Sequence, residues 1–258
     1  MTDTSNDRTT PLKPLKWYKT LASRKGRREA DAFIVEGERS IRQIIGSHPE
    51  AIIEIVTVAE PLPVYRNYEV RRVNESQFNA ISPTRTPQGI MAIVRQPPDT
   101  YSSRMPADTG TKILLLEDIQ DPGNVGALIR TAAAFAFSGV ILTEKCADPL
   151  SPKCVQSTAG AVLSVWLRRV THYLELVQSL HKGGYAVAAA ELNGVDDPSI
   201  LSRQEKLVLA LGNEASGLTN SILNESDYRI NIPTTREKAE SLNVAACGAI
   251  CMYLSSLD

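Results

Sequence analysis

The fold of this chain is decided by the stretch from Leu114 to Leu142, which reads LLLEDIQDPGNVGALIRTAAAFAFSGVIL. Three leucines form an apolar run that ends at Glu117 and Asp118, and a Pro-Gly-Asn turn follows. An Ala-rich segment with helical periodicity then leads to a second apolar run at Val140–Leu142. Two apolar strands joined by a helix are typical of a parallel sheet that is buried on both faces.

Polar side chains gather where the first of these strands ends. Open α/β sheets bind their ligands outside the carboxyl ends of the strands, so function is expected at this point. The polar residues of the loop and of the helix after it are Asp118, Asp121, Asn124 and Arg130.

The charge of the chain is balanced as a whole but not locally. The 258 residues carry a formal net charge of −1, yet residues 8–28 contain eight basic side chains and no acidic one. Such a segment favours contact with a polyanion. A solvated basic tail is the alternative, and the interleaved Trp17 and Tyr18 argue against it.

The cysteines and histidines do not suggest a metal site. The four cysteines and three histidines include no CxxC pair, so no bound metal is expected. Cys247 and Cys251 stand four residues apart in an apolar helical segment, where buried thiols are expected. Because no apolar run has membrane-spanning length and no signal-peptide pattern is present, a soluble cytoplasmic protein is expected.

Two α/β domains joined by a linker are expected. Residues 1–12 are polar and aperiodic, which predicts a disordered tail. Residues 13–96 predict a small α/β domain, and the prolines, serines and glycine of residues 97–111 indicate a linker. In the first domain we expect a helical segment at Lys13–Arg28, strands at Ala32–Val35, Ala51–Val58, Glu69–Val73 and Gly89–Val94, and helices at Glu38–Ile45 and Glu75–Ile81.

Residues 112–258 predict a second α/β domain. Ser241 is expected to be the N-cap of its last helix. Beyond the opening strand, helix and strand, we expect strands at Tyr185–Ala190, Lys206–Leu211 and Tyr228–Ile232, and helices at Pro152–Leu167, Tyr173–His181 and Ser241–Leu254.

Two further segments follow later strands of this domain. The segment 211–218, LGNEASGL, follows an apolar strand, and its glycines let backbone amides approach a ligand closely. An Ile-Pro turn at 232–233 follows the last strand, and the segment 241–246, SLNVAA, opens the last helix. The first segment alone could be an ordinary strand-to-helix turn, but the ordered set is far more specific.

These segments resemble the motifs of one enzyme family. The segments DPGNVG at 121–126 and LIRTA at 128–132 are similar to the first motif of the SpoU (TrmH) family of RNA ribose 2′-O-methyltransferases, in the SPOUT class. Gly212, Glu214 and Gly217 match its second motif, and the Ile-Pro turn with SLNV resembles its third. The resemblance is close over residues 112–256, and less specific over residues 24–38 and 86–90.

The resemblance implies both a fold and a chemistry. The second domain would be an α/β trefoil knot with its last helix threaded through a loop, and the first domain would bind the RNA substrate. The cofactor would be S-adenosylmethionine, held in a bent shape. The expected partners are RNA and a second copy of the chain paired through the knot domain, with neither DNA nor a membrane among them.

The resemblance and the basic segment together predict the site residues. The transfer site is expected to contain Asn124, Arg130, Glu214, Ser241 and Asn243. The residues expected to bind the cofactor are Leu211, Gly212, Asn213, Gly217, Ile232, Pro233 and Leu242. The residues expected to bind RNA are Lys16, Arg24, Lys25, Arg27, Arg28 and Lys153.

Two positions depart from the family pattern. The loop at 234–240, TTREKAE, is one residue longer than expected and lacks the usual glycine, so the cofactor pocket could differ in shape there. Gln156 stands where the family usually has an arginine, so one phosphate contact could be absent.

Three hypotheses for the function remain open from the residues alone. Methylation of ribosomal RNA is favoured because a separate RNA-binding domain precedes the catalytic one, an argument from family analogy. A transfer RNA methyltransferase is an alternative on the same fold. A non-catalytic RNA-binding or ribosome-assembly protein is the other, although such a protein would need none of the transfer-site residues.

Overall fold

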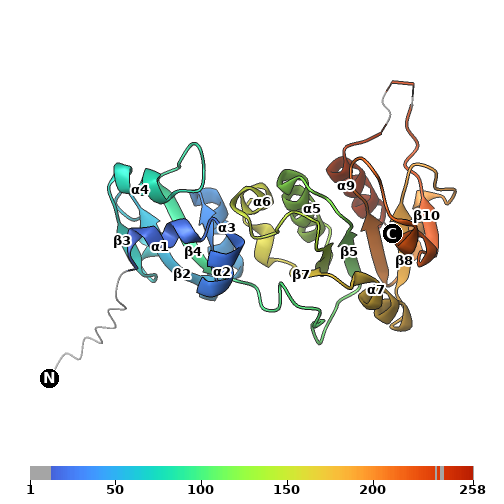
Figure 1. Ribbon diagram of the computed structural model, residues 1–258, viewed down its shortest axis with the longest axis horizontal. Helices are drawn as coiled ribbons and strands as arrows, with labels where there is room; N and C mark the ends of the chain where they lie inside the picture. Colours follow the sequence, from blue (N-terminus) through green and yellow to red (C-terminus); the bar gives the residue numbers. More distant parts are fainter. Residues whose placement is uncertain (1–12, 236, 239–240, 258) are drawn as a thin grey trace.

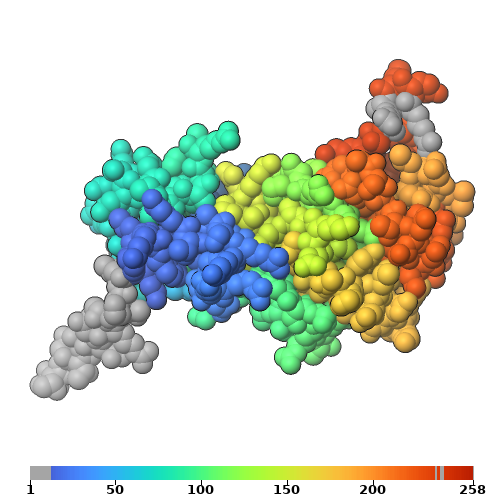
Figure 2. All heavy atoms as spheres, in the orientation of Figure 1, coloured from blue at the N-terminus to red at the C-terminus, as the bar shows by residue number. Residues whose placement is uncertain are grey.

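The computed structural model describes residues 13–235, 237–238 and 241–257, and it contains two α/β units (Figure 1). A four-stranded sheet forms the first unit and a six-stranded sheet forms the second. The space-filling view in Figure 2 shows the two units packed against each other. The tail expected at residues 1–12 lies outside the described residues.

The first unit is built on a sheet with the strand order β1-β4-β2-β3. Strand β4 runs antiparallel to β1 and β2, and β3 runs parallel to β2. Phe33 and Val35 pack on the same side as Ile41, whereas Ile34 packs with Tyr18 on the other side. The elements are β1 (Ala32–Glu36), β2 (Ile52–Thr57), β3 (Val70–Arg72), β4 (Ile90–Arg95), α1 (Leu15–Thr20), α2 (Arg24–Ala30), α3 (Glu38–Ser47), α4 (Glu75–Ile81), η1 (Pro49–Ala51) and η2 (Pro63–Tyr65).

The basic segment forms two helices, where one helical segment at Lys13–Arg28 was expected. Ser23 separates them and caps α2, because its side chain accepts a hydrogen bond of 3.0 Å from the Gly26 amide. The backbone turns so tightly here that a Cβ on Gly26 would lie 2.1 Å from the Thr20 carbonyl oxygen. The break therefore depends on a cap and on one glycine rather than on periodicity.

The second unit is a sheet of six parallel strands in the order β10-β8-β9-β5-β6-β7, which confirms the expected parallel sheet. Among the described residues, no helix is both long and apolar enough to cross a bilayer. The elements are β5 (Lys112–Leu116), β6 (Gly139–Thr143), β7 (Trp166–Val170), β8 (Ala186–Ala190), β9 (Leu207–Leu211), β10 (Tyr228–Ile230), α5 (Pro122–Ala134), α6 (Pro152–Thr158), α7 (Tyr173–Lys182), α8 (Asn220–Asn224), α9 (Val244–Leu254), η3 (Ala161–Leu163) and η4 (Pro198–Arg203).

The prediction of one helix over Pro152–Leu167 was wrong. Helix α6 ends at Thr158, because Ala159 and Gly160 adopt the left-handed conformation with φ of 50° and 93°. The chain then forms the edge strand β7, whose Trp166 ring lies directly against Gly139 of β6. A Cβ at Gly139 would come within 1.9 Å of that ring, so the absence of a side chain there makes room for the strand.

The N-cap of the last helix lies two residues later than the sequence pattern predicted. Helix α9 starts at Val244, and its N-cap is Asn243 rather than Ser241. The Asn243 carbonyl oxygen Oδ1 accepts from the amides of Ala245 at 2.9 Å and Ala246 at 3.3 Å. The amide side chain therefore satisfies donors that the first turn of a helix leaves free.

A buried ion pair joins the two units. The Arg27 guanidinium, only 2% exposed, lies 2.7 Å from the Asp148 carboxylate, whose side chain is 13% exposed. The same guanidinium donates to the carbonyl oxygens of Leu21 and Ala22, each at 3.0 Å. The expectation that Arg27 contacts RNA is therefore corrected, because its side chain is enclosed at the domain junction.

The segment expected to be a linker is docked on β7. Arg168 of β7 is 3% exposed and donates to the carbonyl oxygens of Pro98 and Arg104. The Arg169 amide donates to the Thr100 carbonyl oxygen at 2.7 Å. These bonds hold residues 97–104 along the edge strand and limit how far the two units can turn relative to each other.

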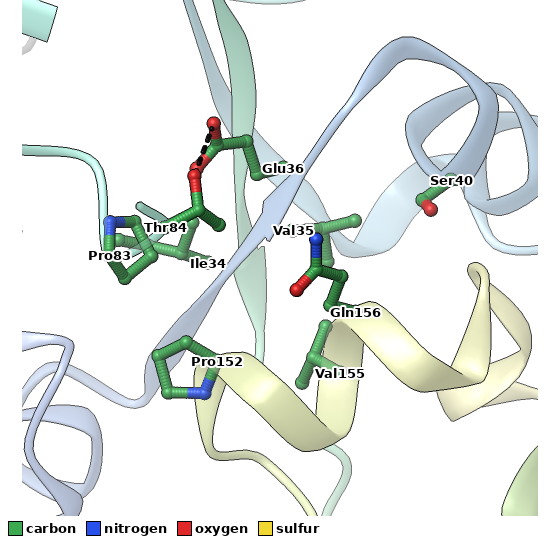
Figure 3. A pocket seen from close by; sticks show the side chains of 9 residues that line it. All are labelled: Ile34, Val35, Glu36, Ser40, Pro83, Thr84, Pro152, Val155 and Gln156. Atoms are coloured by element: carbon green, nitrogen blue, oxygen red, sulfur yellow. Dashed lines mark hydrogen bonds between the residues drawn. The ribbon is translucent and has the colours of Figure 1, made fainter. Parts of the chain in front are cut away.

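A shallow groove runs along another part of the junction (Figure 3). Pro152 and Gln156 of α6 face Pro83 and Thr84 of the first unit across it, beside β1. Gln156, which replaces the arginine expected from the family pattern, thus lies at this junction. The phosphate contact that this arginine would make is therefore expected at the junction of the two units.

Arg27→Ala is expected to lower the free energy of unfolding by about 3–5 kcal/mol, because it leaves the nearly enclosed Asp148 carboxylate without its cation. Urea denaturation measures this change. Lys25→Ala on the same helix is the matched control, because Lys25 lies 3.8 Å from Glu29 in an exposed pair. Equal losses in the two variants would contradict the assignment of the buried pair as the structural one.

Candidate active site

The carboxyl ends of the six parallel strands share one edge of the sheet, and a buried carboxylate organises the loops there. Glu117, the residue after β5, is 2% exposed. It accepts bonds from the amide and from the hydroxyl of Thr219, each at 2.7 Å, and a third bond from the Tyr173 hydroxyl. Burial, followed by the bond to Glu117, raises the pKa of Tyr173 to about 12. Glu117 therefore ties the end of the 212–218 loop to the central strand.

Asp118 links the same loop to the neighbouring strand. Its backbone has a φ of 57°, a left-handed conformation that is uncommon for residues other than glycine. Its carbonyl oxygen accepts from the Asn213 amide group at 2.8 Å, and its carboxylate accepts from the Thr143 hydroxyl at 2.6 Å. Lys145 lies 3.3 Å from that carboxylate. The loops after β5, β6 and β9 are thereby held together.

Three of the five residues expected at the transfer site form one hydrogen-bonded network. The Asn124 amide Nδ2 donates to Glu214 Oε1 at 2.8 Å, and the Asn243 amide Nδ2 donates to Asn124 Oδ1 at 3.1 Å. Each residue comes from a different one of the three motifs. Because the α9 cap fixes Oδ1 of Asn243, its Nδ2 must face Asn124, and Nδ2 of Asn124 must then face Glu214.

Asn124 itself is held by the start of α5. Asp121 caps this helix by accepting from the amides of Gly123 and Asn124. These backbone bonds, together with nearby Lys153, lower the pKa of the Asp121 carboxyl group. The cap keeps Asp121 ionised and fixes the position from which Asn124 reaches the network.

The other two expected residues lie outside the network. Ser241 lines the adjacent cavity. Arg130 follows Asn124 by six residues on α5, a rise of about 9 Å along the helix axis. Its side chain is exposed and forms no hydrogen bond or ion pair with any described residue. A free guanidinium at this place is available to a ligand that is not part of the chain.

A cavity of about 310 Å³ opens between the ends of β8, β9 and β10 and the start of α9. This volume falls within the range of roughly 300–1,000 Å³ that small-molecule sites have. Glu214 and Ser241 lie in its wall, and Pro233 is the one residue expected at the cofactor site that does not. The six that line it are Leu211, Gly212, Asn213, Gly217, Ile232 and Leu242.

The second motif turns tightly where it forms part of the cavity wall. The amides of Asn213 and Gly217 each donate to the carbonyl oxygen of the other, at 3.2 and 2.9 Å. A Cβ on Gly212 would lie 2.3 Å from the Gly217 carbonyl carbon, so a side chain there would displace the loop. Gly217 has a φ of 68°, which favours glycine.

Two parts of the cavity wall were not expected from the sequence. Residues 190–193 line it from the end of β8, and Cys247 lines it from the first turns of α9. The β8 residues follow a buried strand, so the rule that ligands bind at carboxyl strand ends could have identified them. Cys247 carried no such signal, because its position depends on how α9 packs.

Five of the six residues expected to bind RNA are exposed. Lys153 lies at the start of α6, 3.3 Å from Asp121, the residue that caps α5 below Asn124. The other four lie on the first two helices: Lys16 on α1 and Arg24, Lys25 and Arg28 on α2. Arg27 is the buried exception described above.

Comparison with known proteins identifies both units. The model of the SpoU rRNA methylase family matches residues 111–253, and that of the MRM3-like substrate binding domain matches residues 13–92. A protein of Bacillus subtilis named 23S rRNA (guanosine(2553)-2′-O)-methyltransferase RlmP is 30% identical over 244 residues, 93% of this chain and 94% of that protein.

Solved structures agree with these matches. The AdoMet-bound rRNA methyltransferase of Sinorhizobium meliloti is 27% identical with a TM-score of 0.76, over 99% of this chain and 96% of that one. The SpoU methyltransferase AviRb of Streptomyces viridochromogenes, in complex with AdoMet, has a TM-score of 0.81 at 24% identity, over 95% and 97% of the two chains, and shows the fold alone. With its three motifs joined at one sheet edge and its match over residues 111–253, this chain belongs to the SpoU rRNA methylase family.

Proposed function

We propose that this chain transfers a methyl group from S-adenosylmethionine to a ribose 2′-hydroxyl of ribosomal RNA. The observation that carries the proposal is the network of Asn124, Glu214 and Asn243 beside a cavity of small-molecule size. Glu214 belongs to the network and also lines the cavity, so a cofactor in the cavity would lie next to the polar groups of the network.

The cavity residues fit S-adenosylmethionine. The lack of side chains at Gly212 and Gly217 lets the adenosine approach the backbone closely, and Leu211, Ile232 and Leu242 supply apolar surface. When bound, the cofactor supplies a methyl group on a positively charged sulfonium. The exposed loop at 234–235 borders the cavity at Thr234, so a difference in loop length would change this rim.

Alignment is the main contribution that the residues make to this reaction. Holding two reactants in line lowers the barrier by about 7–11 kcal/mol, whereas a general base typically adds about 10²- to 10⁴-fold, near 3–5 kcal/mol. The network suits alignment because the orientation of both amides is forced by the α9 cap. Asn124 and Asn243 would orient the ribose hydroxyls, and Glu214 would hold the side-chain amide of Asn124 in place.

Arg130 would hold the RNA rather than accept the proton. A guanidinium is effectively always protonated in proteins, so it cannot serve as a general base. It binds phosphate through two parallel hydrogen bonds and stabilises negative charge that grows on oxygen. The exposed, unpaired side chain on α5 is free for that contact.

The substrate is inferred to be ribosomal RNA, bound by residues 13–96 and modified by residues 112–258. The relative from Bacillus subtilis, whose name specifies 23S rRNA, matches across both parts. The exposed cations Lys16, Arg24, Lys25, Arg28 and Lys153 would supply affinity for phosphates. A cytoplasmic location follows from this substrate. The intact network argues against a non-catalytic RNA-binding protein.

The chain is inferred to pair through its last helix. Two exposed apolar side chains lie one turn apart on α9, Ile250 at 38% and Tyr253 at 52% exposed, and Leu257, 41% exposed, follows just after the helix ends. Phe135, the residue after α5, extends this apolar surface, with its ring centre 6.1 Å from that of Tyr253. Exposed apolar patches of this kind mark protein–protein contacts.

The trefoil knot implied by the family is also proposed. Support comes from Gly248 of α9, which lies against Leu128 of α5 and Leu211 of β9, so the last helix sits deep against the central strands. An experimental structure in which residues 231–257 pass through no loop would contradict it.

Labelled methyl transfer from S-adenosylmethionine to unmodified ribosomal and transfer RNA tests the proposed reaction. We expect label at one ribosomal position, protected from nucleases as a 2′-O-methyl nucleotide. Asn243→Asp should lower the rate by about 10²-fold, because an aspartate caps the helix but cannot donate to Asn124. Its unfolding free energy should stay within about 0.5 kcal/mol of the wild-type value. Label in transfer RNA alone, or in neither pool, would contradict the proposal.

Arg130→Lys keeps the positive charge but loses the planar fork, and we expect its activity to be low at every pH. The reason is that a phosphate held bidentately by a guanidinium is not held in the same way by an ammonium group. A pH–rate profile of the variant and the wild type is the measurement. Recovery of the variant at high pH would instead indicate that residue 130 accepts the proton.

Tyr253→Glu is expected to convert a dimer into a monomer, because it places a charge in the apolar face of α9. Sedimentation velocity at micromolar concentration measures the change. Leu62→Glu, at a residue 40% exposed in the first unit, is the matched control and should remain dimeric. A monomeric wild-type protein would refute the pairing.

A further inference from the structure

Two arginines of the first unit stack on a tyrosine at the domain junction. The guanidinium carbons of Arg24 and Arg28, both on α2, lie 4.9 and 5.7 Å from the ring centre of Tyr101. Tyr101 belongs to the segment between the two sheets, and its hydroxyl donates to Asp148 at 2.8 Å. These contacts hold both guanidinium groups next to the second unit.

A third arginine, Arg169 of β7, approaches the same place from the second unit. Its Nη2 donates to the carbonyl oxygens of Glu144 and Cys146. Its Nε and Nη1 atoms are enclosed and bond to no described residue. Burial lowers the pKa of Arg169, and the positive charge of Arg24 lowers it further.

The cluster of Arg24, Arg28 and Arg169 has a surplus of positive charge. None of the three forms an ion pair with a described residue. Asp148 faces the cluster, but it is already bonded to Arg27, to the Tyr101 hydroxyl and to the Leu150 amide. The other nearby carboxylates are engaged elsewhere: Glu29 lies 3.8 Å from Lys25, and Glu144 accepts from Thr171 at 3.3 Å.

This arginine cluster lies at the same sheet edge as the catalytic network. Strands β5, β6 and β7 are neighbours, and Arg169 is the last residue but one of β7. Adjacent strands lie about 4.7–4.9 Å apart, so β7 is roughly 10 Å from β5 along the edge. Lys145, after β6, lies between them.

We propose that Arg24, Arg28 and Arg169 together bind a backbone phosphate of the RNA, a few nucleotides from the ribose that is methylated. The inference rests on the proposed function and adds to it a site that both units build. Guanidinium forks match phosphate geometry, and a phosphate between Arg24 and Arg169 would relieve their repulsion and satisfy the enclosed donors. The site would also fix which stretch of the strand reaches the network.

The salt dependence of RNA binding tests this site. The probe is a single-stranded oligouridylate, because phosphate contacts do not depend on sequence. Each phosphate contact of a single strand contributes about 0.7 to the slope of log K against log salt concentration. Arg24→Gln and Arg28→Gln should each weaken binding, and the double variant should lower the slope by about 0.7. Both residues are exposed, so the variants should fold.

Arg203→Gln is the matched control, because it removes the same charge from the end of η4, before the amino end of β9. Its slope should equal the wild-type slope. Arg169→Lys keeps the positive charge but loses the planar guanidinium with its paired N–H donors. It should keep the salt-dependence slope and weaken RNA binding several-fold. A flat wild-type slope, or a double variant with the same slope as Arg203→Gln, would overturn the proposal.

Two further measurements on the same proteins distinguish failure of the phosphate site from failure of the proposed function. Cofactor binding by calorimetry and labelled methyl transfer are measured on the wild-type protein and on each variant. A wild-type protein that methylates RNA while the double variant keeps its slope refutes the phosphate site alone. A wild-type protein that neither binds S-adenosylmethionine nor transfers methyl refutes the function itself.

Discussion

The parallel direction of six strands is the constraint on which the rest of this structure depends. It brings the loops after β5, β6, β8 and β9 to one edge, where the enclosed Glu117 carboxylate ties the central strand to Thr219. Residues that lie 90 and 119 positions apart in the chain can therefore share hydrogen bonds, as Asn124 does with Glu214 and Asn243. The cavity and the network are two consequences of the same strand order.

The junction between the two units is the second determinant of how this protein works. One buried ion pair, Arg27 with Asp148, fixes the helices of the first unit at the carboxyl edge of the second. The segment 97–104 is held on β7 by Arg168, so it is part of the interface rather than a free tether. This geometry places the exposed cations Arg24 and Arg28 of α2 against Tyr101 at the junction.

Several sequence expectations failed for a common physical reason. The helical pattern after Pro152 continues past Thr158, but two left-handed residues end the helix and Trp166 enters the sheet over Gly139. Ser241 looks like a cap, yet Asn243 takes that role, because its side chain also reaches Asn124. In each case a contact with a distant segment outweighs a local preference of modest energy.

The sequence by itself determined the parallel sheet, the three motifs and part of the cavity wall. Strand and helix periods are local properties, and residues that follow buried strands in one parallel sheet must meet at its edge. Only the tertiary structure decided which charges are buried and which are free. Arg27 and Asp148 are 121 positions apart and belong to different units. Burial and pairing of this kind depend on packing between distant segments, which no local pattern records.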